Sequence, residues 1–181
     1  MMKRYFPPGN SRLSKYIKEC SVISNPEDLE RFMFKIFEDC RNYLMREMGI
    51  VPSDCKVKII YKLEEYSELK KDYEKRSGQQ VSDMAFIDHS KKAILGYDII
   101  YINFRNHFEN KPIKCSICDL SVSYIEELIH SSDSRKSETE TVKLTFSAFK
   151  GFLGKELPEE IKQEALKQAK LRDQIDSARF V

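Results

Sequence analysis

The sequence lacks any segment that would tie the protein to a membrane. No uncharged apolar stretch reaches the roughly 18 residues that a membrane-spanning helix needs. The nearest approach, residues 93–102, is interrupted by Asp98. Residues 1–9 are basic but have no apolar run of the kind that signal peptides contain. We therefore expect a protein without membrane contact.

An excess of charge of one sign is also missing. The chain has 31 Lys and Arg residues against 29 Asp and Glu residues, and the basic residues are dispersed rather than interleaved with aromatic ones. This balance gives no electrostatic basis for binding nucleic acid or an anionic membrane. A protein or peptide is therefore the expected partner.

The few cysteines follow no disulfide pattern. Their number, five, is odd. Without a signal peptide, the expected state is reduced thiols in the cytoplasm. The high content of Lys, Glu, Ile and Tyr hints at a thermophilic source, where an intracellular disulfide would be less unusual.

What remains is the composition of an ordinary globular protein. No internal repeat or low-complexity tract is present, and 41% hydrophobic with 33% charged residues suits a packed core under a well-solvated surface. A length of 181 residues fits one domain. We divide the chain into an N-terminal extension (1–24), a central domain (25–154) and a charged C-terminal helix (155–181).

The first clear element is a core helix over Pro26–Met48. Asn25 is a good N-cap, apolar residues recur at helical spacing, and Gly49 supplies the stop. Between Val57 and Leu63 the residues alternate in the manner of a strand with one wet face. A short, highly charged helix over residues 64–75 follows.

Two apolar runs, Met84–Asp88 and Ala93–Phe104, flank a short polar turn, which predicts an antiparallel hairpin. Gly96 is a candidate bulge or break within the second run. A linker should occupy residues 106–114.

Three helices should follow this linker. The first begins near Leu120 and ends near Ser132. The second starts after Ser137 with a capping box, and the third, which is charged, opens at Pro158. The expected fold class is α+β, with a small mixed sheet of three or four strands packed by several helices.

The only concentrated candidate for chemistry is the stretch Glu126-Glu127-Leu128-Ile129-His130. On a helix, Glu126 and His130 are one turn apart on the same face, so both can reach one ion. Glu127 is rotated from them by about 100° and approaches the outer sphere of that ion. With Ser123 these residues lie opposite an apolar stripe formed by Val122, Tyr124, Ile125, Leu128 and Ile129.

This stretch resembles the H-E-x-x-H helix of the zincin metallopeptidases, in which two histidines bind zinc and the glutamate acts as general base. Glu127 matches the base and His130 the second ligand, but Glu126 stands where the first histidine is expected. Residues 100–103 resemble the edge strand that holds extended substrate in small zincins. Glu140, which opens the next helix, resembles the third ligand of the repressor-cleaving, immunity-type branch. The resemblance implies a zincin-like fold over about residues 56–153.

The missing histidine changes the expected chemistry. Glu126, His130 and Glu140 together cancel the charge of a divalent ion, so the ion is a poorer Lewis acid, and manganese, iron or magnesium suits the site better than zinc. Two functions follow. One is a metal-dependent hydrolase or peptidase, with Glu127 as general base. The other is a non-catalytic protein-binding module on the same scaffold.

Other interpretations compete for the same residues. Glu126, Glu127 and His130 also suit a solvated helix face, and Glu140 also suits a capping box with Ser137, in which case Asp133 or Glu138 replaces it as ligand. A di-iron site built on E-x-x-H would need a second such pair and four bundled helices. The C-x-x-C of Cys115 and Cys118, joined by His130, is the alternative metal site, and His89 is read as a surface turn residue.

Overall fold

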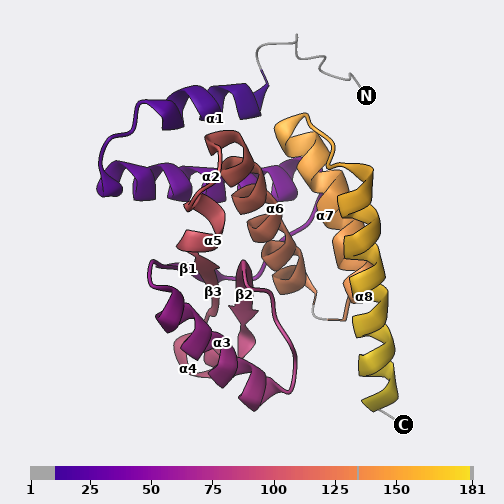
Figure 1. The fold of residues 1–181 in the computed structure, drawn as a ribbon. Helices are drawn as coiled ribbons and strands as arrows, with labels where there is room; N and C mark the ends of the chain where they lie inside the picture. Colours follow the sequence, from indigo (N-terminus) through magenta and orange to yellow (C-terminus); the bar gives the residue numbers. More distant parts are fainter. Residues whose placement is uncertain (1–10, 134, 180–181) are drawn as a thin grey trace.

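A three-stranded mixed sheet lies between a layer of helices and the single helix α3 (Figure 1). The computed structural model describes residues 11–133 and 135–179. The strand order is β1–β3–β2, with β1 (Cys55–Ile60) parallel and β2 (Ala85–Asp88) antiparallel to β3 (Asp98–Asn103). The expected α+β class with a small mixed sheet is confirmed.

The central strand β3 is buried on both faces. Ile99 and Tyr101 face the cluster around α3 (Leu63–Ser77), whereas Ile100 and Ile102 face the main helical core. A strand in this position must be apolar at consecutive positions, which explains its continuous apolar run. The prediction that residues 100–103 form an edge strand is therefore wrong, because β1 and β2 pair with them on either side.

The predicted hairpin is antiparallel, but its connection is longer than expected. Residues 85–88 pair with residues 99–102, and the chain between the strands forms η1 (His89–Lys91) and α4 (Lys92–Leu95). The Asp88 carboxylate accepts a hydrogen bond from the Ser90 amide at 2.9 Å and starts the helical turn. Gly96, at φ 81°, ends α4 and is not a bulge.

The helix α2 (Pro26–Glu47) matches its prediction. The side chain of Asn25 accepts a hydrogen bond from the Asp28 amide at 2.8 Å, and Pro26 occupies the first turn. Leu29 and the buried residues at helical spacing pack into the main core. The next helix, α3, covers the predicted charged segment and ends at Ser77, with Gly78 capping it in the left-handed conformation at φ 71°.

The helix that carries the candidate site starts earlier than predicted. α6 spans Ile113–Ser132, because Pro112 precedes its first turn and the Ser116 amide already donates to the Pro112 carbonyl at 3.0 Å. The short helix α5 (Phe104–Phe108) overlaps the start of the expected linker, and α6 overlaps its end. Helix α6 packs against α2, α7 and β2, and so joins the sheet to the helical layer.

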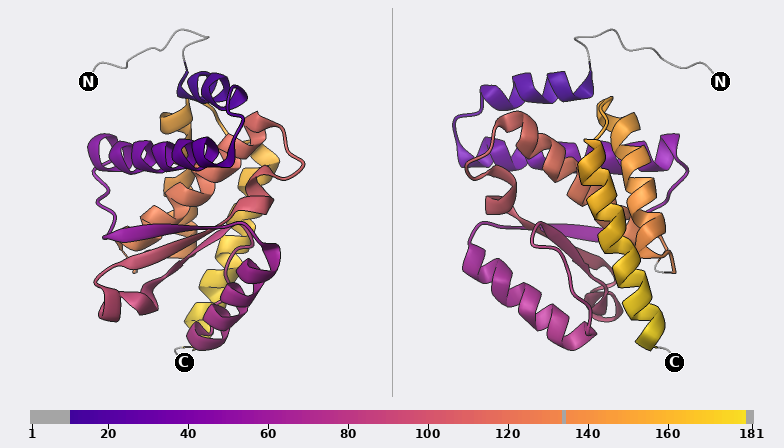
Figure 2. Two further views of the ribbon diagram at one scale, coloured as in Figure 1. Left: turned by 90° about the vertical axis from the view of Figure 1, so that its left-hand side faces the viewer. Right: turned by 45° about the vertical axis from the view of Figure 1, so that its right-hand side comes forward.

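The remaining helices surround α6. The helix α1 (Arg12–Ser21), in the segment read as an extension, packs on α6 with Leu13, Tyr16 and Cys20 buried. The helix α7 (Glu138–Leu153) lies beside α6, and α8 (Glu159–Arg179) runs along α7 (Figure 2). Within the described ranges, no helix has both the length and the apolar character needed to cross a membrane.

Candidate metal centre

Three side chains with metal-binding atoms converge where α6 ends and α7 begins. Glu126 and His130 come from one face of α6, and Glu138 is the first residue of α7. One ligand atom from each lies within 4.8 Å of the others, and the Nε2 of His130 is 3.8 Å from Oε2 of Glu138. A group with this spacing can hold one metal ion.

The sequence identified the pair on α6 but favoured a different third residue. Glu140 lies in the capping box of α7, where its carboxylate accepts a hydrogen bond from the Ser137 amide at 3.1 Å. Its side chain is exposed and is not part of the group that Glu138 completes. Asp133 pairs instead with Arg135, whose hydrogen bonds lower the pKa of that carboxyl group.

Helix α8 holds Glu138 in place. The carboxylate of Asp173 accepts hydrogen bonds from the Glu138 and Thr139 amides, at 2.7 Å and 3.1 Å. These amides are free donors at a helix N-terminus, and the carboxylate also complements the helix dipole. Burial acts to raise the pKa of Asp173, but the hydrogen bonds from Thr139 and Glu138 lower it further than burial raises it.

Arg172 supplies the nearby positive charge. Its guanidinium Nη1 lies 3.4 Å from Oε2 of Glu138, and its charge also lowers the pKa values of Glu126 and Glu127. Nothing in the sequence pattern of the charged C-terminal helix distinguishes Arg172 from its many charged neighbours. Its role follows only from how α8 lies on α7.

Glu127 lies deeper than the three clustered residues. Its side chain points toward β2 and is only 8% exposed, so the polar face of α6 is not a solvated one. Burial raises its pKa well above the usual range, with further increases from the Glu126 and Glu138 charges, while a hydrogen bond with the Ile87 backbone acts in the opposite sense. The Ile87 amide is available to Glu127 because Ile87 and Ile100 form a non-hydrogen-bonded pair of the antiparallel ladder. The Ile87 N–H therefore points away from β3.

The electrostatics of the cluster favour a bound cation. Burial and the charge of Glu138 raise the pKa of Glu126 to about 7. Burial lowers the pKa of His130, and Arg172 and His89 act in the same direction, although Glu138 opposes them. His130 is therefore neutral at pH 7 with a lone pair to donate, while the Arg172 charge lowers the pKa values of the neighbouring carboxylates.

The alternative site at the C-x-x-C motif does not form with His130. Cys115, Cys118 and His130 all belong to the single helix α6. Twelve residues separate Cys118 from His130, and a rise of about 1.5 Å per residue places them about 18 Å apart. The five cysteines lie in the described ranges and form no disulfide with one another.

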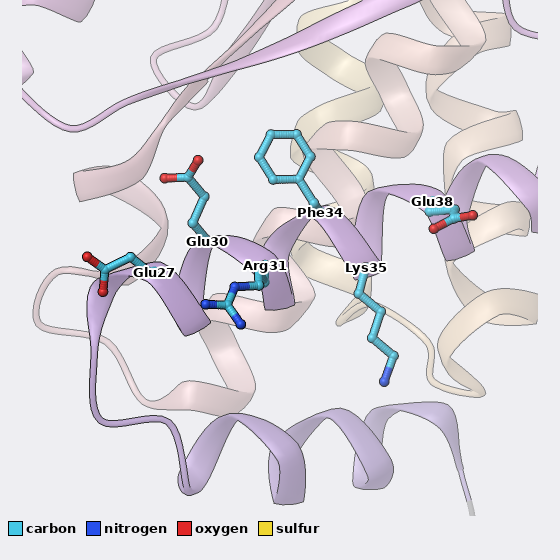
Figure 3. A pocket seen from close by; sticks show the side chains of 6 residues that line it. All are labelled: Glu27, Glu30, Arg31, Phe34, Lys35 and Glu38. Carbon is cyan, nitrogen blue, oxygen red and sulfur yellow. The ribbon is translucent and has the colours of Figure 1, made fainter.

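A surface hollow elsewhere carries none of these residues. It lies along the outer face of α2 and exposes Phe34 among charged side chains (Figure 3). Two of the charged residues there already have partners outside the hollow, since Lys35 pairs with Glu19 of α1 and Glu30 accepts a hydrogen bond from the Tyr61 hydroxyl. A shallow, exposed hollow is a poorer candidate for chemistry than the half-buried cluster between α6 and α7.

Comparisons of the chain with protein-family models, curated proteins and solved structures found no match. The functional inference therefore depends on the geometry of the cluster itself.

Proposed function

We propose that this protein is a metal-dependent hydrolase, with a divalent ion held by Glu126, His130 and Glu138 and with Glu127 as general base. The convergence of these three ligand atoms within 4.8 Å, from two helices that pack tightly, is the observation that carries the proposal. The adjacent buried Glu127 supplies a third acidic group that a simple structural ion pair would not need.

The donor set indicates which ion to expect. Two carboxylates and one imidazole form an oxygen-rich set, which suits manganese, iron or magnesium better than zinc. Zinc is typically bound at sites rich in sulfur and nitrogen. A cation also relieves the repulsion among neighbouring carboxylates that raises the pKa values of Glu126 and Glu127. In the bound state such an ion would supply Lewis acidity to the reaction.

A peptide is the substrate class that we infer. The true edge strand beside the site is β2, since β3 is central. The backbone groups of Ala85 and the carbonyl of Ile87 point away from β3, and an extended chain can pair with them, while the Ile87 amide is already engaged by Glu127. Glu127 contacts this edge through Ile87, so its carboxylate lies between the edge strand and the proposed ligands.

Elemental analysis and manganese titration of the purified protein test the metal centre. We expect about one ion per chain and its loss in Glu126→Ala and His130→Ala, whereas Glu140→Ala should keep it. Hydrolysis of a degenerate peptide library, abolished by Glu127→Gln with the ion still bound, would support the assigned base. Protein that takes up no ion would overturn the proposal.

A non-catalytic protein-binding module is the second candidate. Helix α8 supports it, because Ile161, Leu171 and Ile175 are exposed apolar residues on its otherwise charged surface. Metal-loaded protein that hydrolyses no member of the peptide library would favour this function over the first.

A further inference from the structure

A second polar group lies at the opposite end of β3 from α5. Asp98, the first residue of the strand, is only 1% exposed. Its Oδ2 accepts a hydrogen bond from the Ser53 hydroxyl at 2.6 Å and lies 3.8 Å from Nζ of Lys92. Its Oδ1 is buried, accepts no well-aligned hydrogen bond within the described ranges, and lies 3.2 Å from Nδ1 of His89.

This arrangement sets the chemical state of the His89 ring. A buried carboxylate oxygen is stable only with a donor beside it, so Asp98 favours the tautomer in which Nδ1 carries the proton. The other nitrogen, Nε2, then keeps its lone pair. The His89 side chain is 42% exposed and has room to turn. A carboxylate on one imidazole nitrogen with the other nitrogen free is the arrangement found behind metal-ligating histidines.

The hydrogen bonds around His107 show how β2 lies relative to α6. Met84 accepts from the amide of Asn103 in the neighbouring strand. The carbonyl of Asn103 is 2.7 Å from Nδ1 of His107, and Nε2 of His107 is 3.2 Å from the Ser123 hydroxyl. Met84, directly before β2, is thus linked through Asn103 and His107 to Ser123 on α6.

Farther along both elements, Ile87 meets Glu127. β2 and α6 therefore run in the same direction, and His89 follows two residues after Ile87 while His130 follows three residues after Glu127. From Ile87 the extended chain advances about 6.6 Å to His89, and from Glu127 the helix advances about 4.5 Å to His130. The two histidines consequently end at nearly the same level, and the charge of His89 acts on His130.

We propose that Nε2 of His89 is a fourth protein ligand of the metal centre formed by Glu126, His130 and Glu138, with Asp98 as the positioning residue behind it. This inference rests on the proposed function. Two imidazoles and two carboxylates balance a divalent charge, and the additional nitrogen favours cobalt, iron or zinc over magnesium. His89 turns from its present position toward the cluster when the ion binds.

Cobalt(II) alone is the probe for affinity, measured by calorimetry on the full chain. We expect His89→Ala to weaken binding at least tenfold and Asp98→Asn to weaken it by about 10- to 100-fold. The double variant should bind no more weakly than His89→Ala, because both changes act through one ligand. Lys91→Ala, in the same exposed turn, is the matched control and should leave the affinity unchanged.

Zinc-loaded protein labelled with 15N tests coordination directly. We expect the Nε2 resonances of His89 and His130 to shift on zinc binding, while both ring nitrogens of the buried His107 do not. An unshifted His89 ring, or wild-type cobalt affinity in His89→Ala with loss in His130→Ala, overturns the fourth ligand and leaves the metal centre intact. Wild-type protein that binds neither ion overturns the metal centre and the fourth ligand together.

Discussion

Replacing Arg172 with glutamine should strengthen metal binding. The guanidinium lies 3.4 Å from Oε2 of Glu138, so a metal ion bound to that oxygen would lie about 5 Å from the arginine charge. Arg172 is 44% exposed, so a dielectric constant close to that of water applies. The repulsion between charges of +1 and +2 at this distance is then about 1.7 kcal/mol, equivalent to an affinity change on the order of tenfold.

Calorimetric titration with manganese at low ionic strength measures this effect. Lys170→Gln is the matched control, because it removes the same charge from an exposed position two residues away on α8. We expect Arg172→Gln to bind manganese about tenfold more tightly and Lys170→Gln to match the wild type. The difference should shrink in high salt, which screens exposed charges. Unchanged or weaker binding in Arg172→Gln would refute the placement of the ion beside Glu138.

Three further outcomes follow from contacts outside the ligand set. Asp173→Asn should lower the free energy of unfolding by about 1 kcal/mol, measured in urea, because it weakens the hydrogen bonds that cap the Glu138 and Thr139 amides at the start of α7. Burial lowers the pKa of His107, so the unfolded chain binds more protons below about pH 6.5 and stability falls as the pH drops through that value. His107→Asn should reduce this slope between pH 7 and 5, and an unaltered slope in urea titrations would contradict the assignment. Gly151→Ala should cost about 1–3 kcal/mol and lower the melting temperature, since its methyl group would lie 1.8 Å from the Tyr43 hydroxyl oxygen; wild-type stability would show that the Tyr43 ring moves aside freely.

The sequence predicted well wherever a local interaction decides the outcome. The caps Asn25 and Ser137 fix where α2 and α7 begin, because their side chains bond to amides only three residues away. The pairing of Glu126 with His130 follows from the helical repeat alone. These features depend on neighbours within one turn of the chain.

Long-range packing decided the remainder. An apolar run such as residues 99–102 fits an edge or a central strand until its partners are known, and β1 and β2 make it central. The start of α6 was likewise decided by packing: the helix begins directly after Pro112 and not near Leu120. Cys115, Cys118 and His130 therefore lie on one continuous helix, which keeps the cysteines far from His130.

The third residue of the metal centre shows the boundary most clearly. Glu138 and Glu140 are two positions apart on α7, about 200° around the helix, so only one of them can face α6. The sequence determined that a carboxylate follows the turn after His130. The packing of α7 and α8 decided which carboxylate turns inward. It also placed Arg172 beside the Glu138 carboxylate and Asp173 on the Glu138 amide. Contacts between distant helices leave no periodic signal in the sequence, so the sequence could not predict them.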